Sequence, residues 1–218
     1  VGIPPFELLA ASFGVAAIAG VAFVLRPGGP GVDGLRQPVG AAALSIGALF
    51  GYHALYFIAL KRAPAVEASL VNYLWPLLIV VLAAPLAGAR VLPAQWIGTA
   101  LGFLAAALLV TRGGRVDVAA AHVPGYAAAL GAACVWAAYS VLNRRFAGVP
   151  ATALVPACAA VAVLGLLAHS LFETWVPPTT AQWVAIVAIG LGPTGFAFLL
   201  WDRGTKHGDL AVLGTLAY

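Results

Sequence analysis

The sequence predicts an all-α polytopic membrane protein, and three observations support that fold class. Hydrophobic residues make up 63% of the chain and charged residues only 8%, whereas a soluble domain usually carries about 25% charged residues. The apolar residues run on for about 20 positions at a time, which is the length that a helix needs to cross about 30 Å of hydrocarbon. These runs are continuous and do not alternate with polar residues, as the strands of a transmembrane barrel would.

Eight apolar segments follow one another along the chain, and each is a candidate membrane-spanning helix. The connections between them, such as residues 26–37 and 143–150, are polar or rich in Gly and Pro and are too short to form a soluble domain. In chain order, the predicted spans cover residues 6–25, 40–60, 67–87, 93–110, 124–142, 151–171 and 181–201, and the eighth begins at Asp209.

The charged residues also fit a membrane protein. All seven acidic residues fall in the connections or near the ends of spans, because a charge in hydrocarbon is costly. The net charge is +4, but the basic residues are scattered over the connections, where they orient the chain, and so we expect no nucleic acid partner. The predicted spans carry too few charged residues to form the surface of a soluble protein, and the lipid bilayer is therefore the expected environment.

The basic residues predict the orientation of the chain. Counted by alternate connections, seven lie on one side and four on the other, and the positive-inside rule places the seven in the cytoplasm and Val1 outside. The seven are Arg26, Arg36, Arg90, Arg144, Arg145, Arg203 and Lys206, and the four are Lys61, Arg62, Arg112 and Arg115. A chain that starts outside, with no Met and no signal-peptide pattern, is expected to lack its true beginning.

An internal repeat is half visible. A shift of 142 residues aligns Lys61 with Arg203 and Glu67 with Asp209. In each copy the basic residue lies at the end of one span and the acidic residue at the start of the next. Spans one to three are then repeated as spans six to eight, which implies a unit of five helices. An odd number of helices inverts the second copy, as in many transporters. We therefore expect inverted five-helix repeats and ten helices in the complete protein. Residues 1–115 form most of the first repeat, without its first helix, and residues 116–218 most of the second, without its end.

Two polar-aromatic clusters lie at one depth in the second and third spans. Tyr52 and Tyr56 are four residues apart and share a helix face, with His53 beside them. Deep aromatic side chains can stack on a ligand ring or hold a cation by their π faces. The wall that we expect consists of Tyr52, Tyr56, Tyr73, Trp75 and Trp136. Ordinary helix packing by the same rings is the alternative, as is a neutral His53 bonded to a facing helix.

Asn72 and Pro76 form the polar part of the expected site. Pro76 has no N–H to donate to the carbonyl of Asn72, so a backbone acceptor and a side-chain amide are both available inside a predicted span. A substrate ammonium or a water could satisfy them. Alternatively, Pro76 only kinks the helix and Asn72 bonds to a neighbouring helix.

Glycines and a second proline suggest where helices bend or approach. In the seventh span, Gly192 and Pro193 lie in a run of small residues, and Pro193 leaves the carbonyl of Ile189 without its helical donor. We expect Pro76, Gly192 and Pro193 to act as hinges, with tight packing without movement as the alternative for the last two. Gly47 and Gly51 form a GxxxG pattern that permits a close helix approach, which we expect within a monomer.

The sequence contains no set of residues that indicates an enzyme or a metal centre. Ser45, Ser69, Ser140 and His53 have no spacing that makes a hydrolytic set, and no pair of deep acids is present. His53 has no second ligand near it in the sequence. Cys134 and Cys158 lie within predicted spans, where we expect them to pack as small apolar residues. We therefore predict no catalytic residue, no metal and no cofactor.

Two segments resemble the EamA family of the drug/metabolite transporter superfamily. They are the run Trp136 to Arg145 (WAAYSVLNRR) and the run Ala63 to Pro76 (APAVEASLVNYLWP), and the resemblance extends over essentially the whole chain. The sequence pattern formed by Tyr52, His53 and Tyr56, followed by the segment Asn72 to Pro76, is similar to that of the aromatic amino acid exporters within the family.

The resemblance implies a secondary transporter of the bacterial inner membrane that exports aromatic and other neutral amino acids by alternating access. The substrate-binding residues that we expect are Tyr52, His53, Tyr56, Asn72, Tyr73, Trp75, Trp136 and Tyr139. Transport of drugs or quaternary ammonium compounds is an alternative within the superfamily. Transport of sugar phosphates is another, although no Lys or Arg lies in the middle of a predicted span. An intramembrane enzyme is a remote alternative.

Overall fold

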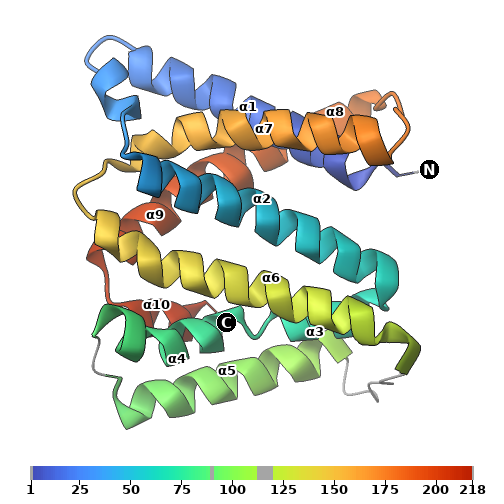
Figure 1. Ribbon diagram of the computed structural model, residues 1–218, viewed down its shortest axis with the longest axis vertical. Helices are drawn as coiled ribbons and strands as arrows, with labels where there is room; N and C mark the ends of the chain where they lie inside the picture. Colours follow the sequence, from blue (N-terminus) through green and yellow to red (C-terminus); the bar gives the residue numbers. More distant parts are fainter. Residues whose placement is uncertain (1, 89–90, 112–119, 218) are drawn as a thin grey trace. The chain divides into compact units, whose positions relative to one another are not determined.

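The computed structural model describes residues 2–88, 91–111 and 120–217. Within these ranges the chain folds entirely into helices and connecting loops, without a β-strand (Figure 1). Six helical stretches are long and apolar enough to cross a membrane: Pro5–Leu25, Val39–Arg62, Ala65–Ala83, Ala120–Phe146, Ala151–Phe172 and Thr180–His207. The all-α polytopic fold class predicted from composition and span length is therefore confirmed.

Most helices begin and end within three residues of the predicted spans. Five helices agree with the predicted spans in this way: α1 (Pro5–Leu25), α2 (Val39–Arg62), α5 (Pro93–Thr111), α6 (Val123–Leu142) and α7 (Leu154–Phe172). A 3-10 turn at Ala151–Ala153 precedes α7, and α10 (Leu210–Leu216) occupies the start of the eighth predicted span. The ends of the apolar runs thus predicted the ends of these helices. A backbone in lipid must satisfy its own hydrogen bonds, and so each apolar run folds into a helix.

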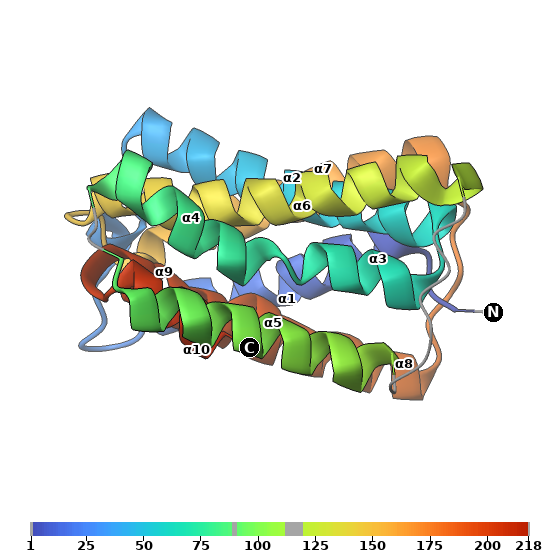
Figure 2. The same ribbon diagram turned by 90° about the horizontal axis from the view of Figure 1, so that it is seen from below.

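The third predicted span is interrupted. It consists of α3 (Ala65–Asn72) and α4 (Trp75–Ala87), and Figure 2 shows the break between them. The amide N–H of Tyr73 donates to the carbonyl of Ser69 at 2.8 Å, and that of Leu74 donates to the carbonyl of Val71 at 3.2 Å, which tightens the end of α3 into a turn. Pro76 has no N–H to continue the helix.

The seventh predicted span is longer than expected and contains a π-helical segment. It runs through α8 (Thr180–Leu191), η5 (Gly192–Ala197) and α9 (Phe198–His207). The prediction ended this span at Trp201 and placed the next charged residues in a connection, which was wrong. Asp202 is a fully buried residue of α9, and Lys206 is also buried there. The predicted span was ended before these residues because they are charged. The helix nevertheless continues through them, because their side chains are buried by the surrounding protein.

The chain divides into two compact units. Unit 1 comprises Val1–Phe50 and Phe146–Arg203, and unit 2 comprises Gly51–Arg145 and Gly204–Tyr218. Each unit therefore combines segments from both predicted repeats. The two repeats, residues 1–115 and 116–218, were inferred from the sequence alone and stay a prediction.

In unit 1, α1 packs along α7 and against α8. Glycines allow these close contacts, because a Cβ added at Gly165 would lie 3.1 Å from the backbone nitrogen of Ala10. A Cβ added at Gly190 would lie 2.7 Å from the carbonyl oxygen of Ser12. Small residues at helix contacts are typical of membrane proteins, where packing replaces the hydrophobic effect between helices.

In unit 2, α6 packs on α3 and α4, and α10 packs on α4 and α5. A Cβ added at Gly214 would lie 2.8 Å from the carbonyl oxygen of Pro76, so α10 closely approaches the start of α4. Buried alanines, with Tyr56 against them, form the adjoining core: Ala59, Ala63, Ala68, Ala128 and Ala129. Small side chains therefore hold α6 and the second half of α2 close to α3.

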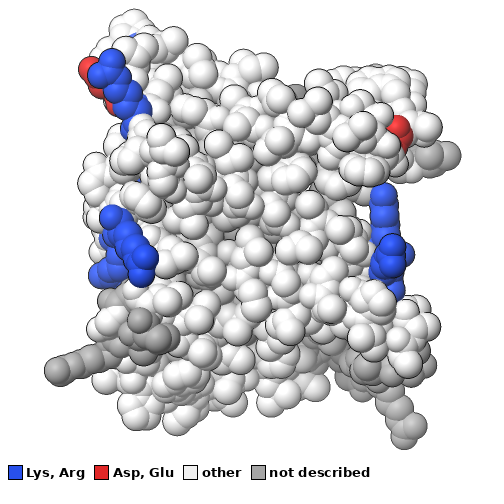
Figure 3. Space-filling model, in the orientation of Figure 1, with Lys and Arg blue, Asp and Glu red and all other residues white. Residues whose placement is uncertain are grey.

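The surface agrees with a lipid environment. On the face drawn in Figure 3, charged side chains lie near helix ends and the surface between them is uncharged. Large hydrophobic side chains are exposed along single helices, among them Leu101, Leu104 and Leu108 of α5 and Leu166 and Leu167 of α7. Rows of exposed leucine are stable when the solvent is hydrocarbon.

Candidate functional site

The candidate site lies in unit 2, where α2, α6 and the break between α3 and α4 meet. The second half of α2 contributes Tyr52, His53 and Tyr56, and α6 contributes Trp136 and Tyr139. The end of α3 contributes Asn72, the turn that follows contributes Tyr73, and α4 begins with Trp75. All eight predicted binding residues thus belong to one compact unit.

Two hydrogen bonds join α2 to α3 at this site. The side-chain amide of Asn72 donates to the hydroxyl oxygen of Tyr52 at 3.1 Å, and the hydroxyl groups of Tyr56 and Ser69 are 3.0 Å apart. Ser69 was not among the predicted binding residues. It lies three positions before Asn72 and therefore on the same face of α3, and this spacing could have identified it.

Asn72 also carries an unsatisfied acceptor. Its side chain is buried, with 6% of the residue exposed, and its Oδ1 has no hydrogen-bond partner among the described residues. Leaving a buried acceptor without a partner costs about 1–3 kcal/mol. The alternative in which Asn72 merely bonds to a neighbouring helix therefore accounts for its Nδ2, which bonds to Tyr52, and not for its Oδ1.

Trp136 is the centre of the aromatic contacts. Its ring centroid lies 5.4 Å from those of Tyr52 and Tyr139 and 6.4 Å from that of Trp75, with the two indoles nearly perpendicular at 87°. Tyr52 also stacks on Tyr56 at 6.1 Å. These distances fall in the range where aromatic pairs attract each other. The aromatic cluster, which consists of Tyr52, Tyr56, Trp75, Trp136 and Tyr139, therefore links three helices.

The members of the site differ in exposure. Tyr139 is 2% exposed and Trp136 8%, whereas Tyr73 in the turn is 37% exposed. His53 is half-buried, with its ring 5.1 Å from that of Tyr52 and 6.2 Å from that of Phe57. Tyr139 is thus enclosed by protein, while Tyr73 presents a large part of its surface.

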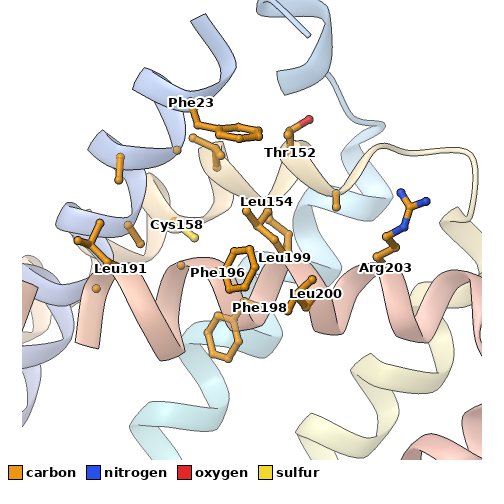
Figure 4. A pocket seen from close by; sticks show the side chains of 17 residues that line it. Phe23, Thr152, Leu154, Cys158, Leu191, Phe196, Phe198, Leu199, Leu200 and Arg203 are labelled. Atoms are coloured by element: carbon orange, nitrogen blue, oxygen red, sulfur yellow. The ribbon is translucent and has the colours of Figure 1, made fainter. Parts of the chain in front are cut away.

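The predicted hinge residues lie at irregular backbone. Pro76 is the second residue of α4, directly after the break, and Gly192 and Pro193 begin the π-helical segment η5. Beside η5, unit 1 contains an apolar groove of about 360 Å³, in which Phe196, Phe198 and Leu154 are grouped (Figure 4). A π-helical turn widens a helix and often marks a functional position.

The described part of the chain contains no group of three or more His, Cys, Asp or Glu residues that could hold a metal ion. Cys134 and Cys158 are both free. Cys158 is buried and lines the apolar groove, while Cys134 is exposed. The residues brought together in unit 2 offer hydrogen-bonding groups and aromatic rings.

Comparison with known proteins identifies the family. The sequence matches the EamA-like transporter family over residues 1–111 and 123–218. It is 46% identical over 217 residues to the aromatic amino acid exporter YddG of Ancylobacter novellus, which covers 99% of this chain and 75% of the relative. It is 29% identical over 213 residues to the uncharacterized transporter YyaM of Bacillus subtilis, covering 93% of this chain and 69% of the relative.

The fold comparison agrees with these matches. A crystal structure of a protein with 46% sequence identity superposes with a TM-score of 0.94, covering 100% of this chain and 76% of the other. The family match and the relative of Ancylobacter novellus point to the same group of multi-pass membrane proteins, which are transporters and not enzymes. The chain belongs to the EamA-like transporter family.

Proposed function

We propose that this chain is a secondary transporter that exports aromatic and other neutral amino acids across a bacterial inner membrane by alternating access. The observation that carries the proposal is the buried Oδ1 of Asn72, which lacks a hydrogen-bond partner among the described residues. The amide nitrogen of Asn72 bonds to the hydroxyl of Tyr52, and the ring of Tyr52 lies 5.4 Å from that of Trp136. An amino acid offers an ammonium for the oxygen and, when aromatic, a ring for the indole.

A ligand with both an ammonium group and an aromatic ring is favoured energetically. The ammonium of an amino acid would satisfy Oδ1 and offset a cost of about 1–3 kcal/mol. Aromatic contacts contribute about 0.5–1.5 kcal/mol each beyond their burial, and a cation over an aromatic face about 0.5–2 kcal/mol. The 46% identity to a relative named as an aromatic amino acid exporter supports the same substrate class.

Each site residue has a role in this proposal. Asn72, Tyr52 and Tyr56 bind the ammonium end, with Ser69 positioning Tyr56. Trp75 and Trp136 contact the substrate side chain, and His53 and Tyr73 donate to its carboxylate. Tyr139, which is almost fully buried against Trp136, acts by holding that indole in place.

Alternating access requires helices that bend. We assign this role to Pro76 after the break in the third span and to Gly192 and Pro193 in η5. We further propose that the eight spans belong to a ten-helix protein built from inverted five-helix repeats, divided at residues 115 and 116. The family match over residues 1–111 and 123–218, on either side of that division, supports this organisation. The proposed transporter works as a monomer, with the start of α1 on the outer side.

Transport into proteoliposomes tests the proposal. We expect purified protein to move radiolabelled phenylalanine, and we expect Asn72→Leu to lower the rate at subsaturating substrate by about tenfold, equivalent to about 1.4 kcal/mol. Trp96→Leu is the control, because Trp96 lies in the first turn of α5 and outside the aromatic cluster. Equal rates for Asn72→Leu and unchanged protein would refute the site, and no transport of any neutral amino acid would refute the function.

The same assay separates the alternative substrates. A quaternary ammonium cation would use the aromatic cluster without a carboxylate, so tetramethylammonium would inhibit phenylalanine transport and would itself be carried. The sugar phosphate alternative lacks support, since none of the eight proposed binding residues is Lys or Arg, and phosphates are usually bound by such residues.

A further inference from the structure

A second polar cluster lies in unit 1, where the start of α1 meets the end of α7. The carboxylate of Glu173 accepts hydrogen bonds from the backbone N–H of Phe6, at 3.1 and 3.2 Å to its two oxygens, and from that of Glu7 at 3.3 Å. His169 Nδ1 lies 3.0 Å from Oε2 of the same carboxylate. Glu173 therefore satisfies the free N–H groups that begin α1.

Glu7 is the second carboxylate at this place, and its hydrogen bonding is incomplete. Its Oε2 accepts a bond of 3.1 Å from the backbone N–H of Val176, whereas its Oε1 has no hydrogen-bond partner in the described part of the chain. The residue is only 3% exposed. An ionised carboxylate is favoured in the first turn of a helix, but half of this one lacks a donor or counter-charge.

Glu7 lines a pocket. The pocket has a volume of about 260 Å³, and Glu7 is the only ionisable residue among the described residues that line it. Trp175 and Trp183 form part of the wall, and the rest is aliphatic, with Leu166 and Val163 its largest members. Trp175 is 60% exposed and Trp183 45%, so the two indoles present surface that neighbouring protein does not cover.

The chemistry of this lining selects a class of ligand. A hard metal cation such as Ca²⁺ takes six to eight oxygen ligands, and this pocket offers a single carboxylate. An anion is disfavoured by the buried charge of Glu7. An organic ammonium cation matches all three parts, because its charge pairs with the carboxylate, its carbon atoms contact the aliphatic wall, and indole faces attract cations within about 6 Å.

We propose that the pocket formed by Glu7, Trp175 and Trp183 binds a small organic ammonium cation, and that Oε1 of Glu7 supplies the counter-charge. This ligand site is separate from the aromatic cluster around Trp136, since its residues belong to unit 1 and those of the cluster to unit 2. The proposal does not depend on the substrate that is transported.

Calorimetry on the purified protein in lipid nanodiscs tests the site with choline as the probe. The comparison ligand is 3,3-dimethylbutan-1-ol, which has the shape of choline without its charge. We expect choline to bind and its neutral isostere to bind at least about tenfold more weakly. Glu7→Gln keeps an acceptor for the N–H of Val176 but removes the charge, and it should weaken choline binding by about tenfold or more.

A matched control and a second variant complete the test. Glu67 also has an oxygen without a partner among the described residues, and it does not line the pocket, so Glu67→Gln should bind choline as the unchanged protein does. Trp183→Leu replaces a half-exposed ring, which should not unfold the protein, and should weaken choline binding several-fold through loss of a contact worth about 0.5–2 kcal/mol.

The outcomes distinguish this site from the transport site. Trp136→Leu should leave the choline affinity unchanged. If Trp136→Leu abolishes choline binding while Glu7→Gln and Trp183→Leu do not, choline binds in the aromatic cluster and the proposed pocket is refuted. Equal binding of choline and its neutral isostere, or displacement of choline by an equal concentration of sodium, would refute the ligand class.

Discussion

The hydroxyl of Tyr52 in α2 accepts a 3.1 Å hydrogen bond from the side-chain amide of Asn72 at the end of α3. This bond fixes which way the amide faces, because its nitrogen is committed to Tyr52 and its oxygen is left buried without a partner among the described residues. The two residues are twenty positions apart in the sequence. Their pairing creates the acceptor on which the proposed substrate site depends.

The first prediction concerns the coupling between these two residues. Tyr52→Phe removes the acceptor for the amide nitrogen, so the amide can turn and its oxygen loses its fixed direction. We expect Tyr52→Phe and Asn72→Ala each to weaken phenylalanine binding, and the double variant to weaken it by less than their sum. The difference should be about 0.5–1.5 kcal/mol, the net value of one hydrogen bond. Calorimetric titration of the four proteins measures it, and strict additivity would contradict the prediction.

The second prediction concerns Trp136, whose ring contacts residues of α2, α4 and α6. Replacing this buried indole by Ala should lower the free energy of unfolding by about 3–5 kcal/mol, because a large cavity is left in the packing. Trp136→Phe keeps an aromatic ring and should recover most of that stability. Thermal unfolding in detergent checks both. As a control, Trp96→Ala in α5 should have a much smaller effect, since Trp96 is 41% exposed.

The third prediction concerns the carboxylate that begins α1. Glu173→Ala removes the acceptor for the N–H groups of Phe6 and Glu7 and should lower stability by about 0.5–2 kcal/mol, as the loss of a helix-capping acceptor does. Asp33→Ala provides the comparison, because Asp33 pairs with Arg36 and both side chains are about four-fifths exposed, at 79% and 81%. Exposed pairs of this kind contribute little, so that variant should unfold like the unchanged protein.

The fourth prediction uses two glycines with opposite surroundings. A Cβ at Gly190 would lie 2.7 Å from the carbonyl oxygen of Ser12 and 2.6 Å from Cβ of Val15, whereas a Cβ at Gly47 would meet no described atom within 4 Å. Gly190→Ala should therefore destabilise the protein by about 1–3 kcal/mol, the usual cost of overpacking. Gly47→Ala should be neutral or stabilising by up to about 1 kcal/mol, because Ala favours the helix. Equal unfolding temperatures for the two variants would contradict this prediction.

The fifth prediction concerns the π-helical segment. Pro193→Ala restores an N–H at a position where the helix now widens, and it should allow a more regular and stiffer helix. If this segment bends during transport, the maximal rate should fall several-fold while the binding affinity for phenylalanine stays the same. Pro124→Ala is the control, because Pro124 lies at the start of α6, where proline is well tolerated. A parallel loss of affinity would indicate a packing role for Pro193.

The sequence was sufficient to predict the fold class and the helix positions, because each span must bury its backbone in its own hydrogen bonds. It was less informative where tertiary contacts decide. Pro76 predicted a disturbed helix, but the turn actually precedes it, at Tyr73 and Leu74, where the helix can end with bonds to Ser69 and Val71. The end of the seventh span was wrong because Asp202 is buried in a helix, which hydropathy cannot distinguish from a connection.

The candidate site was predictable in outline for a similar reason. Equal depth in neighbouring spans brought Tyr52 and Asn72 to one place, and this required only helix geometry. The packing role of Tyr139 and the pairing of Tyr56 with Ser69 depend on side-chain contacts that span depth does not specify. The GxxxG pattern was a poor guide, because a Cβ at Gly47 would meet nothing described within 4 Å and a Cβ at Gly51 would meet only Val135, at 4.0 Å. Glu173 and Phe6 are 167 positions apart, and no local pattern predicts their bond.

The interruption of the third span has an electrostatic consequence. A helix that ends at Asn72 and another that begins at Trp75 place a partial negative charge and a partial positive charge only three positions apart. A zwitterion can be stabilised by both ends at once, whereas an ion of single charge is attracted by one end and repelled by the other. At the proposed substrate site, this backbone arrangement would favour dipolar solutes, without the desolvation that a fixed ionised side chain would require.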